Sequence, residues 1–139
     1  MSFNVGDIPW FDEYVFTDTG EVRSHFGLAI LPETATKFQS SLLCCVITSK
    51  ETKSWSMALN PSNYIACFTK ESFICFDRKD LVPLDGLGGE PQPRGKLTKK
   101  DASDAYKILK KSLFCIQDIG SDIFMRGAII REWKKAIRL

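Results

Sequence analysis

The sequence has little of the chemistry that binds metal ions. It holds one histidine, His25, and no two of its five cysteines form a Cys-x-x-Cys pair. The usual zinc sites need sets of cysteine and histidine ligands at close spacings, so we expect no metal and no cofactor. Four of the cysteines lie in apolar, strand-like runs, where a free cysteine behaves as a small buried hydrophobe: Cys44, Cys45, Cys67 and Cys75. We therefore expect reduced cysteines.

Long hydrophobic runs are also missing. No stretch of about 18 or more apolar residues occurs, and the N-terminus begins with polar and acidic residues rather than a basic segment and an apolar run. We expect neither a membrane span nor a signal peptide, and therefore a cytoplasmic protein. With 139 residues, of which 44% are hydrophobic and 26% charged, the chain is long enough for one buried core.

The glycine-rich segment lacks the signature of a phosphate-binding loop. Glycines and prolines gather between Asp85 and Gly95, but the Lys-Ser/Thr ending of a P-loop is missing and prolines follow the glycines. This composition predicts a surface loop.

Charge is distributed unevenly along the chain. Residues 1–93 hold 7 Lys and Arg against 12 Asp and Glu, whereas residues 94–139 hold 12 against 5. A polyanionic partner would therefore be attracted to the C-terminal third, or to the boundary between the two parts.

The first two thirds of the chain read as short strands. The segments Asp7–Phe16 and Val22–Leu31 are rich in aromatic and β-branched residues and flank a turn containing Asp and Gly, which predicts an antiparallel hairpin. Further strands are expected at Leu42–Ile47, Tyr64–Phe68, Ser72–Phe76 and Lys79–Leu84. Because closure removes exposed strand edges, this pattern favours a small closed or nearly closed barrel.

Two helices are expected after the strands. Thr98 with Asp101 three residues later resembles a capping box, and six residues then fall on one helical face: Ala105, Ile108, Leu109, Ser112, Leu113 and Ile116. Gly120 and Ser121 should end this helix. A second, basic helix is predicted with the apolar stripe Ile123, Ile130, Trp133 and Ile137. We expect one domain, formed by a barrel with its helix over residues 1–117 and a basic helical extension over 118–139.

Four short segments stand out within this order of elements: Gly6-Asp7-Ile8, Leu28-Ala29-Ile30-Leu31, Cys45-Val46-Ile47-Thr48-Ser49, and Gly95-x-Leu97 before the capped helix. With these segments in this order, the chain from Val5 to Cys115 resembles the PemK/MazF-like toxins of type II toxin–antitoxin systems. The resemblance implies an SH3-like barrel that pairs as a homodimer, binds a cognate antitoxin protein, and cleaves single-stranded RNA, such as messenger RNA, without a metal.

The resemblance also implies site residues. In the family an arginine followed by proline begins the second strand, and a threonine or serine ends the third. Here Thr48 and Ser49 end the third strand, whereas His25-Phe26 takes the place of Arg-Pro and Arg23 lies two residues before it.

The chemistry of RNA cleavage suits these residue types. Attack by the 2′-hydroxyl needs a base, and it needs donors that hold the charge on the phosphate. His25 would serve as base or acid, Arg23 as a phosphate clamp, and the Thr48 hydroxyl as a neutral donor. Arg23 and His25 alternate to the same face of a strand. Ser49, Lys53 and Trp55 are the substrate-binding candidates, with Trp55 stacking on a base.

Structural roles are the alternatives for each of these residues. A single histidine at a strand start is commonly solvated or hydrogen-bonded, Thr48 suits a turn, and Arg23 can pair with Glu21. Two functions therefore remain open, an endoribonuclease toxin and a catalytically inactive barrel that binds a protein or a nucleic acid.

Overall fold

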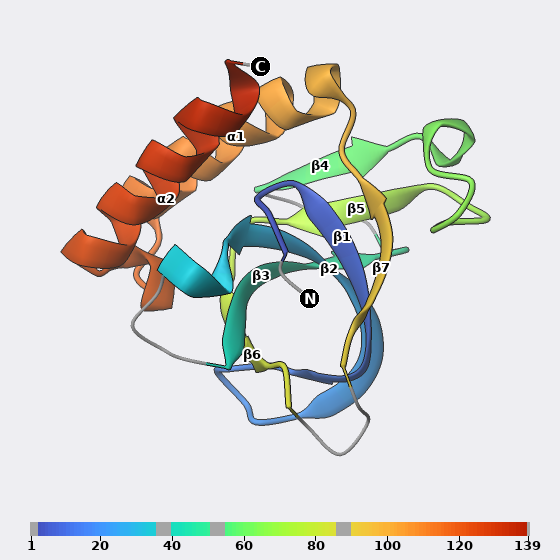
Figure 1. Ribbon diagram of the computed structural model, residues 1–139, viewed down its shortest axis with the longest axis horizontal. Helices are drawn as coiled ribbons and strands as arrows, with labels where there is room; N and C mark the ends of the chain where they lie inside the picture. Colours follow the sequence, from blue (N-terminus) through green and yellow to red (C-terminus); the bar gives the residue numbers. More distant parts are fainter. Residues whose placement is uncertain (1–2, 36–39, 51–54, 86–89, 139) are drawn as a thin grey trace.

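The protein, seen here as a computed structural model, is mainly β with two C-terminal helices (Figure 1). The structure describes residues 3–35, 40–50, 55–85 and 90–138. Its seven strands are β1 (Asp7–Val15), β2 (Val22–Leu31), β3 (Ser41–Thr48), β4 (Ser56–Leu59), β5 (Ser72–Cys75), β6 (Asp80–Pro83) and β7 (Gln92–Lys96). The helices are α1 (Lys99–Cys115) and α2 (Ile123–Ile137), with short 3₁₀ turns at Glu33–Ala35, Pro61–Asn63 and Ile119–Ser121.

All seven strands belong to one antiparallel sheet of order β4-β5-β3-β2-β1-β7. β3 has two partners along one edge, because β6 pairs with its first half and β5 with its last two residues. The sheet is therefore strongly bent (Figure 1). It is not a closed barrel, since within the described ranges β4 and β7 end the path without pairing to each other. Of the two forms expected from the sequence, a closed or a nearly closed barrel, the fully closed one is therefore wrong.

Both faces of the central strands are buried. In β3, Leu43, Cys45 and Ile47 belong to the larger core on the helix side. Their neighbours Leu42, Cys44 and Val46 belong to a second core on the opposite face. This burial explains why β3 is an unbroken apolar run rather than an alternating one.

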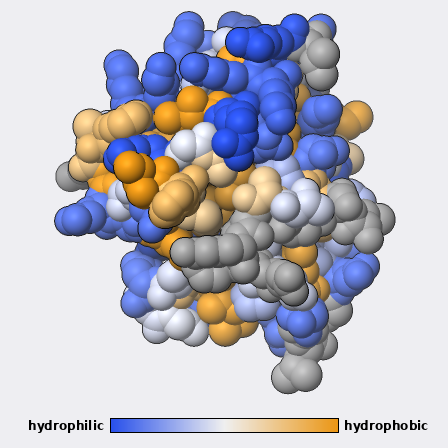
Figure 2. Space-filling model, turned by 60° about the vertical axis from the view of Figure 1, so that its left-hand side comes forward, coloured by the Kyte–Doolittle hydropathy of each residue, from blue (hydrophilic) through white to orange (hydrophobic). Residues whose placement is uncertain are grey.

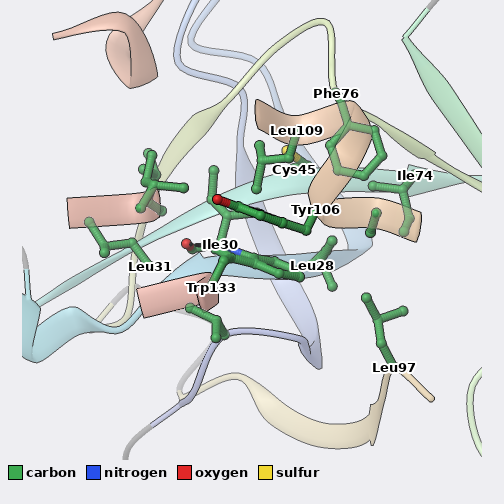
Figure 3. Close-up of a cluster of buried hydrophobic side chains, with 14 of the residues drawn as sticks. Leu28, Ile30, Leu31, Cys45, Ile74, Phe76, Leu97, Tyr106, Leu109 and Trp133 are labelled. Carbon is green, nitrogen blue, oxygen red and sulfur yellow. Dashed lines mark hydrogen bonds between the residues drawn. The ribbon is translucent and has the colours of Figure 1, made fainter. Parts of the chain in front are cut away.

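The two helices cover one face of the sheet (Figure 1). The Thr98 hydroxyl caps α1 by accepting a hydrogen bond from the Asp101 amide at 3.2 Å, which is one of the two bonds of the predicted capping box. The Thr98 amide donates to the Tyr64 hydroxyl rather than to the Asp101 carboxylate. Trp133 of α2 is fully buried, and its indole nitrogen donates to the Ile30 carbonyl of β2 at 2.9 Å. Figure 3 shows its ring beside that of Tyr106 from α1, close to Leu28 and Ile30 of β2. The C-terminal helix is thus part of the core.

Some expected elements differ from the structure. The predicted strand Tyr64–Phe68 is a turn that follows the 3₁₀ helix capped by Asn60. The end of the expected loop is instead β7, which pairs with β1 at the edge of the sheet. At an edge, Pro93 costs no ladder hydrogen bond, so its presence does not prevent a strand. In α2, the buried stripe is Met125, Ala128, Ile129 and Trp133, whereas Ile123 is exposed.

No helix among the described residues has the length and apolar character needed to cross a membrane.

Candidate functional site

One hollow of the described surface, which we call the His25 hollow, has a volume of about 540 Å³. This volume lies within the range of small-ligand sites. Its polar lining comes from five segments and includes Asp18, His25, Thr48, Lys50, Asp77, Arg78, Gln117 and Asp118. The floor is apolar and includes Val46 and Cys75, which belong to the second core.

His25 and Thr48 lie together because of the register between β2 and β3. Phe26 pairs with Ile47, so His25 and Thr48 are the next two residues across from each other at the end of the ladder. They also border a smaller hollow of about 230 Å³, together with Ser49 and the aromatic residues Trp10 and Phe68. The pair therefore forms the ridge between two hollows.

The pKa of His25 is lowered from its usual value, chiefly by burial. A hydrogen bond with the Ile47 backbone acts in the opposite direction, and the charge of Arg23 lowers the pKa further. The imidazole lies edge-on to Phe16, with ring centroids 5.7 Å apart. A lowered pKa makes His25 neutral at pH 7, which is the protonation state that a general base requires.

The Thr48 hydroxyl accepts a hydrogen bond from the Lys50 amide at 3.2 Å. This is the turn-forming role that threonine often takes at a strand end. A hydroxyl that accepts one bond still carries a donor proton, so the turn and a phosphate contact are compatible.

Arg23 does not line either of these hollows. It is exposed on β2 and forms an ion pair with Glu21, the structural alternative that the sequence had left open.

Arg78 supplies the guanidinium of the His25 hollow, and the sequence analysis missed it. Its guanidinium lies 4.8 Å from the centre of the Phe16 ring and donates to Asp18 at 3.1 Å. That hydrogen bond is the main cause of the lowered pKa of Asp18. The local sequence Asp77-Arg78-Lys79-Asp80 is typical of a charged turn between strands, and nothing in it shows that Arg78 packs against Phe16 and Asp18.

A buried ion pair holds one wall of the His25 hollow. Lys79 is 1% exposed, and its ammonium donates to the Ser112 hydroxyl at 2.9 Å and lies 3.5 Å from Asp118. Asp118 also accepts hydrogen bonds from the amides of Lys79 and Gly120. This network ties the turn before β6 to α1 and to the 3₁₀ turn that follows it.

The three predicted substrate-binding residues lie in different places. Ser49 is exposed beside the smaller hollow. Trp55 is not an exposed loop residue, because it is partly buried against the larger core and its carbonyl accepts from the Phe76 amide at 2.7 Å. Lys53 lies outside the described residues.

Within the described part of the chain, no group of three or more His, Cys, Asp or Glu side chains is arranged to hold a metal ion. The sequence matches no model of a known protein family, and a search of curated proteins finds no significant match.

Proposed function

We propose that this protein is a cytoplasmic endoribonuclease that cleaves single-stranded RNA by attack of the 2′-hydroxyl, without a metal. The observation that carries the proposal is the joint position of His25 and Thr48 on the ridge of the His25 hollow. A neutral imidazole, a hydroxyl and a guanidinium there border a space large enough for a nucleotide.

The proposed reaction assigns one role to each side chain. His25 takes the proton of the 2′-hydroxyl, whose oxygen then attacks the adjacent phosphorus. Thr48 donates to a phosphate oxygen, and Arg78 offsets the charge that develops there. The bond from phosphorus to the 5′-oxygen breaks, and that oxygen takes a proton from water. The products carry a 2′,3′-cyclic phosphate and a 5′-hydroxyl.

A more specific proposal is that this endoribonuclease is a PemK/MazF-like toxin with an SH3-like fold, which forms a homodimer and binds a cognate antitoxin. It is supported by the order of the elements, from the β1–β2 hairpin to the Thr98-capped helix after Gly95-x-Leu97. The open edge between β4 and β7 is a departure from a closed SH3-like barrel.

The test is incubation of the protein with a long single-stranded RNA in EDTA, followed by mapping of the product termini. We expect discrete fragments with cyclic phosphate ends. His25→Ala should lower the rate by roughly 10²–10⁴-fold through loss of the base, and Thr48→Ala by a smaller factor.

Two arginines provide a matched control for this experiment. Arg78→Ala should slow cleavage because Arg78 lines the hollow, whereas Arg23→Ala should leave it nearly unchanged because Arg23 is paired with Glu21 at the surface. Cleavage that survives His25→Ala, or RNA that stays intact with the unaltered protein, would reject the proposal.

The alternative is a catalytically inactive module that binds a protein or a nucleic acid. The observation in its favour is that the lining includes three aspartates, Asp18, Asp77 and Asp118, against two cations, Lys50 and Arg78. Carboxylates repel a phosphate chain, and the bond to Asp18 already occupies part of the Arg78 guanidinium. This alternative predicts intact RNA in the same experiment.

A further inference from the structure

Large hydrophobic side chains are exposed at the corner between α1 and α2. Phe114 ends α1 at 60% exposure, and Ile123 and Phe124 begin α2 at 68% and 79%. They are three of the five large hydrophobic residues exposed in the described chain. Single exposed hydrophobics are ordinary, but a group of them marks an interaction surface. We call this group the corner patch.

The packing of the helices brings Phe114 near the start of α2, where Ile123 and Phe124 are neighbours in the sequence. The Arg126 guanidinium lies 4.5 Å from the centre of the Phe114 ring, which places the first turns of α2 against the end of α1. Ile123 lies one helical turn before Arg126, on the same side of α2. Phe114 and Arg126 also border a shallow hollow of about 310 Å³.

The surroundings of the corner patch are basic. Lys110 and Lys111 are exposed one turn before Phe114 on α1, and Arg131 is exposed one turn after Gly127 on α2. The nearest acid, Asp122, caps α2 by accepting from the amides of Phe124 and Met125. Figure 2 shows a face of the molecule on which hydrophobic side chains lie together with hydrophilic ones around them.

We propose that the corner patch binds an acidic amphipathic helix of another protein. The partner's apolar face would cover Phe114, Ile123 and Phe124, and its carboxylates would meet the surrounding lysines and arginines. Exposed Gly127 has open space above it, so a second helix backbone can approach α2 closely there. A second copy of this chain fits poorly, because its own patch would bring a second set of cations against the first.

The corner patch is a different surface from the proposed ribonuclease site. Phe114, Ile123 and Phe124 do not line the His25 hollow, and the shallow hollow shares only Ile116 and Gln117 with it. Aromatic side chains among cations can also stack RNA bases. The exposed aliphatic Ile123 favours a protein, because it offers no ring for a base to stack on.

The test uses a fluorescent synthetic helix of about 18 residues with leucine on one face and glutamate on the other. A peptide with lysine in place of glutamate is the control. Fluorescence anisotropy with the full chain should show binding of the glutamate peptide alone, and this binding should weaken between about 0.1 and 1 M salt.

Substitutions test whether the glutamate peptide binds at the corner patch. The double variant Ile123→Ser, Phe124→Ser should weaken binding by about tenfold or more, and Lys110→Glu with Lys111→Glu should also weaken it. Ile65→Ser is the matched control, because Ile65 is 85% exposed but lies in the turn after Asn63, outside the patch. Circular dichroism should show unchanged folding, since all these side chains lie at the surface.

Four results would overturn the inference. They are failure of the glutamate peptide to bind, equal binding of the lysine peptide, and equal binding by the double variant. The fourth is a single-stranded oligonucleotide that binds the protein more tightly than the glutamate peptide and loses that binding in the double variant, which would identify a nucleic-acid surface. The His25→Ala variant should bind the glutamate peptide as tightly as the unaltered protein does. Peptide binding therefore tests the corner patch whether or not the protein cleaves RNA.

Discussion

The protonation state of His25 is a property of one residue that can be measured without interference. It is the only histidine in the chain, so its imidazole protons give a single set of NMR signals across a pH titration. We expect a midpoint below the ordinary 6.5, because burial disfavours the imidazolium. A midpoint at or above 6.5 would contradict this.

The lowered pKa of His25 also determines the direction in which the stability of the protein changes with pH. The folded pKa of His25 is below the unfolded one, so its contribution to stability is present above about pH 6.5 and is lost as the pH falls through the folded pKa. Denaturant unfolding of His25→Gln should show a weaker loss of stability over this pH range than the unaltered protein.

Two buried tyrosines should respond in opposite ways to loss of the hydroxyl. The Tyr14 hydroxyl donates to buried Asp80 at 2.7 Å, so Tyr14→Phe should cost about 2 kcal/mol in the free energy of unfolding. The Tyr106 hydroxyl is buried and has no hydrogen-bond partner among the residues that the structure describes, so Tyr106→Phe should be neutral or stabilising. Urea unfolding measures both, and similar losses in the two variants would contradict the expected difference.

The contribution of glycine depends on the element that contains it. Gly127 is exposed in the middle of α2, and a Cβ added there meets nothing within 4 Å. Gly127→Ala should therefore stabilise the protein by about 1 kcal/mol through helix propensity. Gly95 in β7 is the control, because a Cβ there would lie 2.7 Å from the Cys67 sulfur. Gly95→Ala should destabilise the protein. The midpoints of thermal unfolding of the two variants measure both effects.

At the same scale, strong local patterns predicted elements better than weak ones. The β1–β2 hairpin, β3 and the Thr98 cap follow from short-range signals and are confirmed. The strand Gln92–Lys96 was missed because its stability comes from pairing with β1, a contact between distant parts of the chain. The predicted stripe of α2 was wrong at Ile123 because periodicity alone leaves the rotation of a short helix poorly fixed.

The candidate site shows the same limit. His25 and Thr48 were expected to lie near each other, because the family resemblance assigns both positions to one site, and they are adjacent across β2 and β3. Arg78 was not expected there, since it comes from a turn brought over the hollow by tertiary packing.

At the scale of the whole molecule, α2 is needed for a complete core. Removing residues 122–139 would take away buried Trp133, Met125 and Ile129 and would uncover the face of β2 that packs against the helices. We expect the truncated chain to lose cooperative thermal unfolding and to bind a hydrophobic dye. A sharp transition close to that of the full chain would show instead that the sheet and α1 are sufficient.

The hydrogen bond from Trp133 to Ile30 has a consequence for biosynthesis. Its two residues are 103 positions apart, which corresponds to roughly 5–20 s of translation. During that interval the inner strands have left the ribosome while the helix that covers them has not yet been made. The nascent sheet must therefore remain uncovered, or be shielded by a chaperone, until Trp133 and the rest of α2 have been synthesised.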